Sequence, residues 1–307
     1  MPEKAAIPYC RQNRWFVARS SAPWLLTAIL CASTAAWAAD PLTIERIAVH
    51  QYEDGPVLPA NHEFLPGESV FFSCRLKGYQ VEKDKKDEDV RGVKLGWQMS
   101  VADPAGVLVE KDTSGRIEER VLPEDKAWLP KFTRSFLIPP FAPAGVYRIS
   151  VKVKDDISGS EAAGTLNLRV RGANILPSET LAARNFRFLH SEDDAIPLQP
   201  PVYRPGETMW AKFDIVGYRF SEGNHLSVDY GLAIDSGAPA DNGKELFAQP
   251  SAAGHQSESF YPQRYVPGAL SLNLDKNVAP GSYTLVVTIR DQIGSQVVEL
   301  REGFKVE

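Results

Sequence analysis

The chain has 307 residues and a net charge of −5, with 43% hydrophobic and 24% charged residues. This is the composition of a folded globular protein, and it excludes collagen, coiled coils and bulk disorder. The 22 Gly and 23 Pro residues are about one residue in seven, which favours short strands joined by turns over long helices. The composition therefore favours an all-β protein.

The first 38 residues have the pattern of a secretory signal peptide. Basic residues up to Arg19 precede an apolar run from Ala22 to Trp37, which closes on Ala36-Trp37-Ala38. Charge, apolar run and small residues in this order are typical of a cleaved signal. We predict cleavage after Ala38 and an exported protein, periplasmic or extracellular, with no membrane span after signal removal. The alternative is a retained anchor, although the apolar run is shorter than the roughly 20 residues of a membrane span.

Removal of the signal changes both the charge and the cysteine content. The signal carries a net charge of +3, so the remaining chain carries −8. An acidic chain repels phosphates, so we expect no nucleic-acid partner. Cys10 and Cys31 leave with the signal, and Cys74 alone cannot form an internal disulfide.

Comparison of the chain with itself shows a tandem duplication. The segment 65–69 (Leu-Pro-Gly-Glu-Ser) recurs at 204–208 (Arg-Pro-Gly-Glu-Thr), and Gly78-Tyr79 recurs as Gly217-Tyr218, both at an offset of 139. Ordered matches over this length predict two repeats of about 130 residues, a usual domain size. We place the first repeat at residues 39–172 and the second at 173–307.

Each repeat has the alternating pattern of β-strands. Apolar residues occupy every second position from Tyr147 to Val153 and from Tyr283 to Ile289, and again from Val70 to Leu76 and from Met209 to Ile215. About seven short strands per repeat, with no predicted helix, indicate two tandem antiparallel β-sandwiches. In this register Cys74 occupies the position of Phe213, which predicts a small core residue. The alternative for Cys74 is a reactive thiol.

The end of each repeat resembles a known group of domains. A Pro- and Gly-containing turn leads into Tyr147 or Tyr283, an alternating strand follows, and then Asp155 to Gly159 or Asp291 to Gly294 precedes a last strand. This order resembles bacterial extracytoplasmic Ig-like or fibronectin-type-III-like domains. The resemblance implies Ig-like β-sandwiches with a tyrosine corner, a phenol that hydrogen-bonds to the chain just upstream. The Cys pair of antibody-type domains is missing, and no binding residue is carried over.

The sequence contains no motif of known catalytic chemistry. It has no His-Glu-x-x-His, no Gly-x-Ser-x-Gly and no Gly-x-x-x-x-Gly-Lys. His50 and His190 share a repeat position, as do Glu68 and Glu207 in the Pro-Gly-Glu turns, so we expect structural roles for them, with general acid catalysis as the alternative for the glutamates. We therefore predict no catalytic residue, no cofactor and no metal site.

The alternative to this prediction is a calcium site at one of two acidic segments. Glu53-Asp54 and Glu192-Asp193-Asp194 follow the repeated histidines and contain oxygen ligands of the kind that calcium prefers. Neither segment has the spacing of a calcium loop. We expect solvated loops at both places.

Aromatic residues in irregular, Pro-containing segments are the best candidates for binding. They lie at matching places in the two repeats, and loops on a rigid sandwich commonly carry recognition. Exposed rings stack on sugars or anchor a protein partner. The alternative is that the rings close the flank of the sandwich. The candidates are Trp128, Phe132, Phe260, Tyr261 and Tyr265.

These observations predict a non-catalytic binding or assembly protein of the cell envelope, whose partner is an envelope protein or a polysaccharide. A carbohydrate-binding or enzyme-accessory module is the alternative that the aromatic segments favour. A third hypothesis is an enzyme with paired carboxylates in a cleft near residues 173–201.

Overall fold

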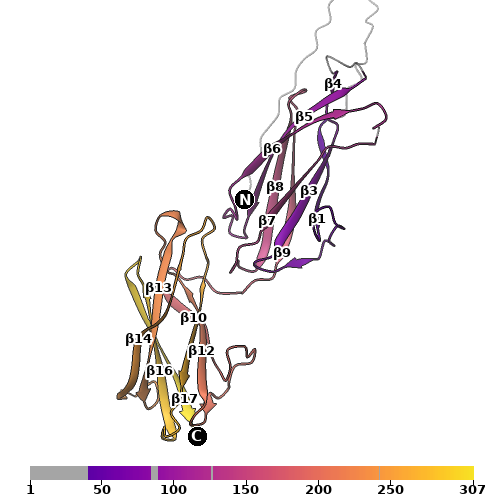
Figure 1. Ribbon diagram of the computed structural model, residues 1–307. Coiled ribbons are helices and arrows are strands. Elements are labelled where there is room, and N and C mark those ends of the chain that lie inside the picture. Colours follow the sequence, from indigo (N-terminus) through magenta and orange to yellow (C-terminus); the bar gives the residue numbers. More distant parts are fainter. Residues whose placement is uncertain (1–40, 84–88, 126, 242) are drawn as a thin grey trace, which may run out of the picture. The chain divides into compact units, whose positions relative to one another are not determined.

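The computed structural model describes residues 41–83, 89–125, 127–241 and 243–307 (Figure 1). The predicted signal peptide lies outside the described residues. Within the described part, no helix is long and apolar enough to cross a membrane.

The described residues form strands in two groups, with one short 3-10 helix, η1 (Glu222–Asn224), in the second. The first group consists of β1 (Thr43–His50), β2 (Glu63–Phe64), β3 (Ser69–Lys77), β4 (Glu82–Lys83), β5 (Arg91–Ala102), β6 (Thr113–Val121), β7 (Lys131–Leu137), β8 (Gly145–Asp155) and β9 (Glu161–Val170). The second consists of β10 (Ala182–Leu189), β11 (Val202–Tyr203), β12 (Thr208–Val216), β13 (Leu226–Ser236), β14 (Glu245–Ser257), β15 (Val266–Asn273), β16 (Gly281–Asp291) and β17 (Gln296–Val306).

Each group contains a small sheet and a large sheet. In the first group, β1-β3-β7 is the small sheet, and β2-β9-β8-β5-β4, with β6 also paired to β5, is the large one. In the second, β10-β12-β15 faces β11-β17-β16-β13-β14. All pairings are antiparallel except the short β2–β9 and β11–β17 pairs. The predicted all-β fold of antiparallel Ig-like sandwiches is confirmed, while the domain boundary at residue 172 stays a prediction.

The residues predicted to point inward form two separate cores. In β8 and β16 the inward sets from Tyr147 and from Tyr283 are buried, and the lysines between Tyr147 and Asp155 are exposed. The same holds for Val70 to Leu76 in β3 and for Met209 to Ile215 in β12. Strands β1 to β9 supply most of the first core, which also contains Tyr261 from the segment between β14 and β15, and the second core is formed by residues of the second group.

The predicted tyrosine corners are present in both groups. The Tyr147 hydroxyl donates to the Pro143 carbonyl at 3.1 Å, and the Tyr283 hydroxyl donates to the Ala279 carbonyl at 2.6 Å. Burial raises the pKa of Tyr147 far above its usual value. The Tyr147 phenol therefore stays neutral. Each of the two hydroxyls ties the start of its strand to the preceding turn.

The Pro-Gly-Glu segments are turns, as predicted. Gly67 and Gly206 have φ values of 85° and 87°, which favour glycine. The carboxylate of Glu68 accepts the Leu65 N–H at 2.8 Å, and that of Glu207 accepts the Arg204 N–H at 2.9 Å. Both glutamates therefore close their own turns.

A buried aspartate fastens two loops together in each group. Asp155 accepts N–H groups from Gln80 and Ile157, both at 2.8 Å. Burial alone would raise the pKa of Asp155, but these donors hold it below its ordinary value. Asp291 is bonded in the same way by Arg219 at 2.9 Å and by Ile293 at 3.0 Å.

One aromatic ring fills the same place in each core but comes from a different strand. Cys74 pairs with Phe132 across β3 and β7, whereas Phe213 pairs with Gly268 across β12 and β15. A Cβ at Gly268 would lie 2.3 Å from the Phe213 ring. The thiol is fully buried, and burial raises the pKa of Cys74 to about 12, so Cys74 is a core residue as predicted.

We predict that Tyr147→Phe and Tyr283→Phe each lower the free energy of unfolding by about 1 to 2 kcal/mol, because each leaves a carbonyl without its donor. Urea unfolding measures the change. Tyr52→Phe is the control, since Tyr52 is 57% exposed. An equal loss in all three variants would contradict the assigned role.

We predict that Gly268→Ala destabilises the chain by about 1 to 3 kcal/mol, because the new methyl group overlaps the Phe213 ring. Gly96→Ala is the matched control in a strand. A Cβ at Gly96 meets no atom within 4 Å, so we expect a change within about 0.5 kcal/mol. Thermal or urea unfolding of the two variants distinguishes packing from a general effect of losing glycine.

Candidate functional site

The aromatic residues predicted for binding lie in different environments. Phe132 is buried and stacks on Trp97, with ring centroids 4.4 Å apart and planes at 2°. Trp128 is half-buried against the first core, edge-to-face with Tyr79 at 6.2 Å. These two rings close the flank of the first sandwich, which is the alternative that the sequence offered.

The other three candidates lie in the segment between β14 and β15. Phe260 is 45% exposed, Tyr261 is buried, and Tyr265 is half-buried against Phe141 with ring centroids 5.6 Å apart. Of the five predicted rings, Phe260 is the most accessible to a ligand. A role of these residues in binding stays a prediction.

Tyr261 belongs to a buried polar network that the sequence did not reveal. Its hydroxyl donates to Asp103 Oδ2 at 2.9 Å, and Arg264 Nη2 donates to the same oxygen at 2.6 Å. Asp103 Oδ1 accepts the N–H groups of Ala105 and Val107, both at 2.8 Å. The carboxylate thus has four donors, which is why it is stable although buried.

These contacts also determine the protonation state of the network. Burial would raise the pKa of Asp103, but the hydrogen bond from Arg264, the backbone donor Val107 and the Tyr261 hydroxyl hold it below its ordinary value. Burial raises the pKa of Tyr261. Asp103 is therefore an anion and Tyr261 a neutral donor over the physiological range.

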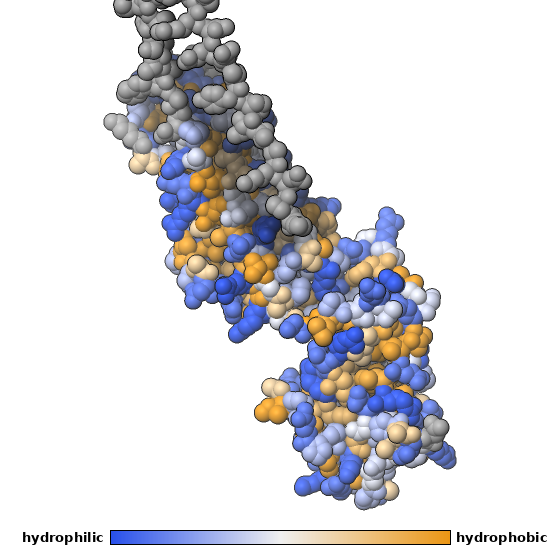
Figure 2. All heavy atoms as spheres, turned by 180° about the vertical axis from the view of Figure 1, so that it is seen from behind, coloured by the Kyte–Doolittle hydropathy of each residue, from blue (hydrophilic) through white to orange (hydrophobic). Residues whose placement is uncertain are grey.

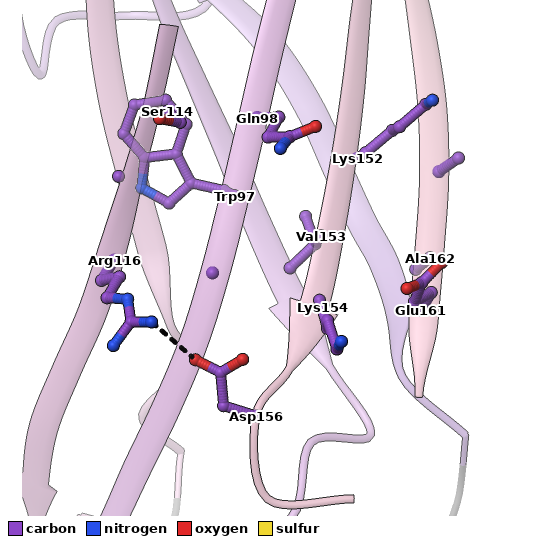
Figure 3. Close-up of a pocket in the computed structure, with 13 residues that line it drawn as sticks. Trp97, Gln98, Ser114, Arg116, Lys152, Val153, Lys154, Asp156, Glu161 and Ala162 are labelled. Carbon is purple, nitrogen blue, oxygen red and sulfur yellow. Dashed lines mark ion pairs between the residues drawn. The ribbon is translucent and has the colours of Figure 1, made fainter. Parts of the chain in front are cut away.

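A polar hollow of about 690 Å³ lies on the large sheet of the first group (Figure 3). Four strands contribute to it, namely β6, β5, β8 and β9. In the pairing register Gly96 lies between Arg116 and Lys154, and Gln98 lies between Ser114 and Lys152. Because Gly96 has no side chain and a Cβ there would meet nothing within 4 Å, bare backbone forms part of the floor.

The walls of the hollow carry hydrogen-bonding groups of both charges. Arg116 lies 4.0 Å from Asp156 and 3.5 Å from Glu118. Figure 3 shows Gln98, Lys152 and Lys154 on the neighbouring strands β5 and β8. Lys152 and Lys154 are exposed. The arrangement suits a polar ligand held by hydrogen bonds, with cations on β6 and β8 and carboxylates just after β8 and at the start of β9.

One signal for this hollow was present in the sequence. In the alternating strand from Val93 to Val101, Gly96 falls on the outward side between Lys94 and Gln98, and glycine within a strand often marks a close approach to backbone. Which strands lie beside Gly96 depends on long-range pairing, so the sequence did not predict its neighbours.

The histidines and acidic segments have local structural contacts. The His50 ring bonds the Gly55 carbonyl at 2.8 Å and the Ser73 hydroxyl at 2.7 Å, while His190 lies 3.9 Å from Glu207. Asp54 pairs with Lys131 at 2.5 Å. Among the described residues, no group of three His, Cys, Asp or Glu is placed to hold a metal ion.

A second cavity, of about 470 Å³, is lined in part by residues 173–178, where the enzyme hypothesis placed a cleft. Asp103 is the carboxylate in its lining, and this group is bonded to Arg264 and Tyr261. The lining contains no pair of carboxylates with which to perform acid–base catalysis.

Comparison with known proteins finds only distant likenesses among solved structures. No family model matches the sequence, and no curated protein matches it. Among solved structures, the C-terminal domain of the Streptococcus agalactiae antigen I/II polypeptide BspA has 11% identity and a TM-score of 0.27, and covers 87% of this chain and 100% of its own. The C-terminal domain of AspA from Streptococcus pyogenes has 9% identity and a TM-score of 0.29, with coverage of 88% and 99%. The C-terminal domain of wzt has 12% identity and a TM-score of 0.28, with coverage of 45% and 77%.

We predict that Asp103→Asn lowers the free energy of unfolding by about 1 to 3 kcal/mol at neutral pH, because Arg264 loses its charged partner. The pKa of Asp103 is lowered in the folded chain, so its contribution is present above the unfolded value of about 3.9 and is lost as the pH falls through the folded value. The difference between the two proteins therefore shrinks below about pH 4. Denaturant unfolding at several pH values measures it.

Asp54→Asn is the control, because the exposed pair of Asp54 with Lys131 contributes little to stability. An Asp103 variant as stable as the parent chain at pH 7 would show that the network does not stabilise the fold.

Proposed function

We propose that the chain is an exported, non-catalytic binding or assembly protein of the cell envelope, built from two Ig-like repeats at residues 39–172 and 173–307. The pattern of residues 1–38 supports export to the periplasm or the medium. The matching tyrosine corners and turns of the two strand groups support the repeats.

The observation that carries the binding role is the polar hollow on the first large sheet. A solvent-facing sheet usually carries a side chain at each outward position, but here Gly96 leaves the backbone open between Arg116 and Lys154. The hollow is large enough for several polar groups of a ligand, and its walls offer an amide, cations and carboxylates.

The mixed charge of the walls favours an envelope protein as the partner. Arg116, Lys152 and Lys154 lie close to Asp156 and Glu161, so the hollow is complementary to a surface that carries both signs. Such a pattern of charges determines the alignment of two bound proteins more than the affinity between them.

A carbohydrate-binding or enzyme-accessory module is the second candidate. Amide, hydroxyl and carboxylate groups at the hollow, here Gln98, Ser114 and Asp156, are the partners that sugar hydroxyls need. The exposed ring of Phe260 is available for stacking on a sugar.

We predict that Gly96→Tyr abolishes most of the capture of the partner, because the new side chain fills the hollow without meeting another atom at its Cβ. Mature protein, residues 39–307, is immobilised, a detergent extract of the source organism's envelope is passed over it, and the eluate is identified. Val146→Tyr is the control, since Val146 is a 51% exposed residue of β8 that does not line the hollow.

A stoichiometric protein that Gly96→Tyr loses and Val146→Tyr keeps would support the assembly role. Retained polysaccharide without protein would move the carbohydrate-binding candidate to first place. Equal capture by both variants would contradict a role for the hollow, and reproducible hydrolysis by purified protein would contradict the non-catalytic assignment.

A further inference from the structure

An apolar crevice of about 480 Å³ lies in the second sandwich, beneath the edge strand β14. β14 is the last strand of its sheet, so its outer backbone edge has no neighbouring strand in that sheet. The walls of the crevice are mostly apolar, and they include Ile234, Phe247, Leu274, Val278, Tyr283 and Phe304.

The crevice leaves large apolar side chains exposed at its mouth. Leu246 is 54% exposed and Phe247 is 44% exposed. Phe247 pairs with Ile234, which is buried in the second core, so Phe247 occupies an inward-facing position of its strand. Figure 2 shows that hydrophobic residues interrupt the polar surface on the face it displays. Phe247 is exposed because its side chain points to the core side at a place that the described residues cover only in part.

The pairing register identifies the counterpart of this place in the first sandwich. Val101 pairs with Ile149, which lies two residues after Tyr147. In the same way Ile234 pairs with Leu285, which lies two residues after Tyr283. Val109, whose N–H donates to Val101, therefore corresponds to Phe247. Val109 is only 6% exposed, against 44% for Phe247. The same place is thus filled in the first sandwich and open in the second.

A side chain from the second strand group, Tyr261, takes part in the core of the first sandwich. Tyr261, which lies in the segment after β14, belongs to the same buried cluster as Val101, Val109 and Tyr147, and its hydroxyl reaches Asp103. The connection before β6 also supplies Val107, whereas the connection at residues 237–244 contains no apolar residue larger than Ala or Pro. The first sandwich thus takes an aromatic ring from outside its own strands into its core, and the second has an opening beside Tyr283, the counterpart of Tyr147.

We propose that the crevice beneath β14 binds an aromatic side chain from an extended segment of a partner protein, whose backbone adds to the edge of residues 245–249. This inference rests on the proposed assembly role and names the kind of segment that the partner presents. Addition of a strand to a free sheet edge is a common mode of peptide binding, in which pockets for alternate side chains give specificity.

The chemistry of the crevice specifies an uncharged ring. In the register, the counterpart of Asp103 is Ser236, whose hydroxyl already accepts the Lys244 N–H at 3.0 Å. Tyr283, Phe304 and Leu274 line the crevice with aromatic and aliphatic side chains. Phe, Tyr or Trp of a partner suits these walls better than a charged side chain.

The test uses a peptide of residues 258–265 (Glu-Ser-Phe-Tyr-Pro-Gln-Arg-Tyr), because this segment fills the counterpart place. Binding of the labelled peptide to the full chain is measured by fluorescence anisotropy. We expect saturable binding that falls about tenfold or more in Phe247→Glu and with a peptide carrying Tyr261→Ala. The control is Leu176→Glu, since Leu176 is 72% exposed and lies outside the crevice.

Each alternative outcome is decisive. No binding of the peptide, or equal binding to Phe247→Glu and the parent chain, would overturn the proposal. Palmitate that displaces the peptide from the parent chain but does not bind Phe247→Glu would assign the crevice to an acyl chain instead. Unfolding midpoints of Phe247→Glu and Leu176→Glu are measured beside that of the parent chain, and equal midpoints are expected if both variants are folded. The hollow is tested separately by Gly96→Tyr, so either proposal can fail alone.

Discussion

The unequal width of the two sheets is the constraint on which the rest of the structure depends. Three strands face five or six in each sandwich, so the small sheet covers only part of the large one. The inward side chains near β6 and β14 must be covered by something else. The valines before β6 and Tyr261 do this in the first sandwich. The crevice at Phe247 shows where the second has no such cover.

The two sandwiches share backbone hydrogen-bonding motifs more strictly than side-chain volumes. Tyrosine corners, Pro-Gly-Glu turns and the buried aspartates Asp155 and Asp291 recur with the same partners. The core ring moved from β7 in the first sandwich to β12 in the second, with Cys74 or Gly268 opposite it. A core tolerates such an exchange when the total volume is kept, whereas a turn depends on one geometry.

The sequence predicted the features that depend on local pattern. Alternation identified the inward residues of β8 and β16, and the repeated motifs predicted their turns and tyrosine corners. It did not predict the polar hollow or the Asp103 network, because these join residues that are far apart in the sequence, such as Asp103 and Arg264, which are 161 positions apart. It left open whether Phe132 and Tyr261 are exposed or close the flank of the sandwich, since periodicity does not show what covers an irregular segment, and both rings are buried.

The bulge in β14 has a consequence for self-association. Tyr230 pairs with Ala253 and Leu232 with Gln249, so Pro250 and its neighbours bulge opposite Gly231, and the Pro250 carbonyl accepts Arg290 Nη1 at 2.7 Å. A Cβ at Gly231 would lie 2.1 Å from that carbonyl oxygen. Proline lacks an N–H, so the free edge of β14 is cut into two short lengths. Long strands from other molecules cannot extend along it, which protects this edge against fibrillar growth while leaving room for a short guest segment.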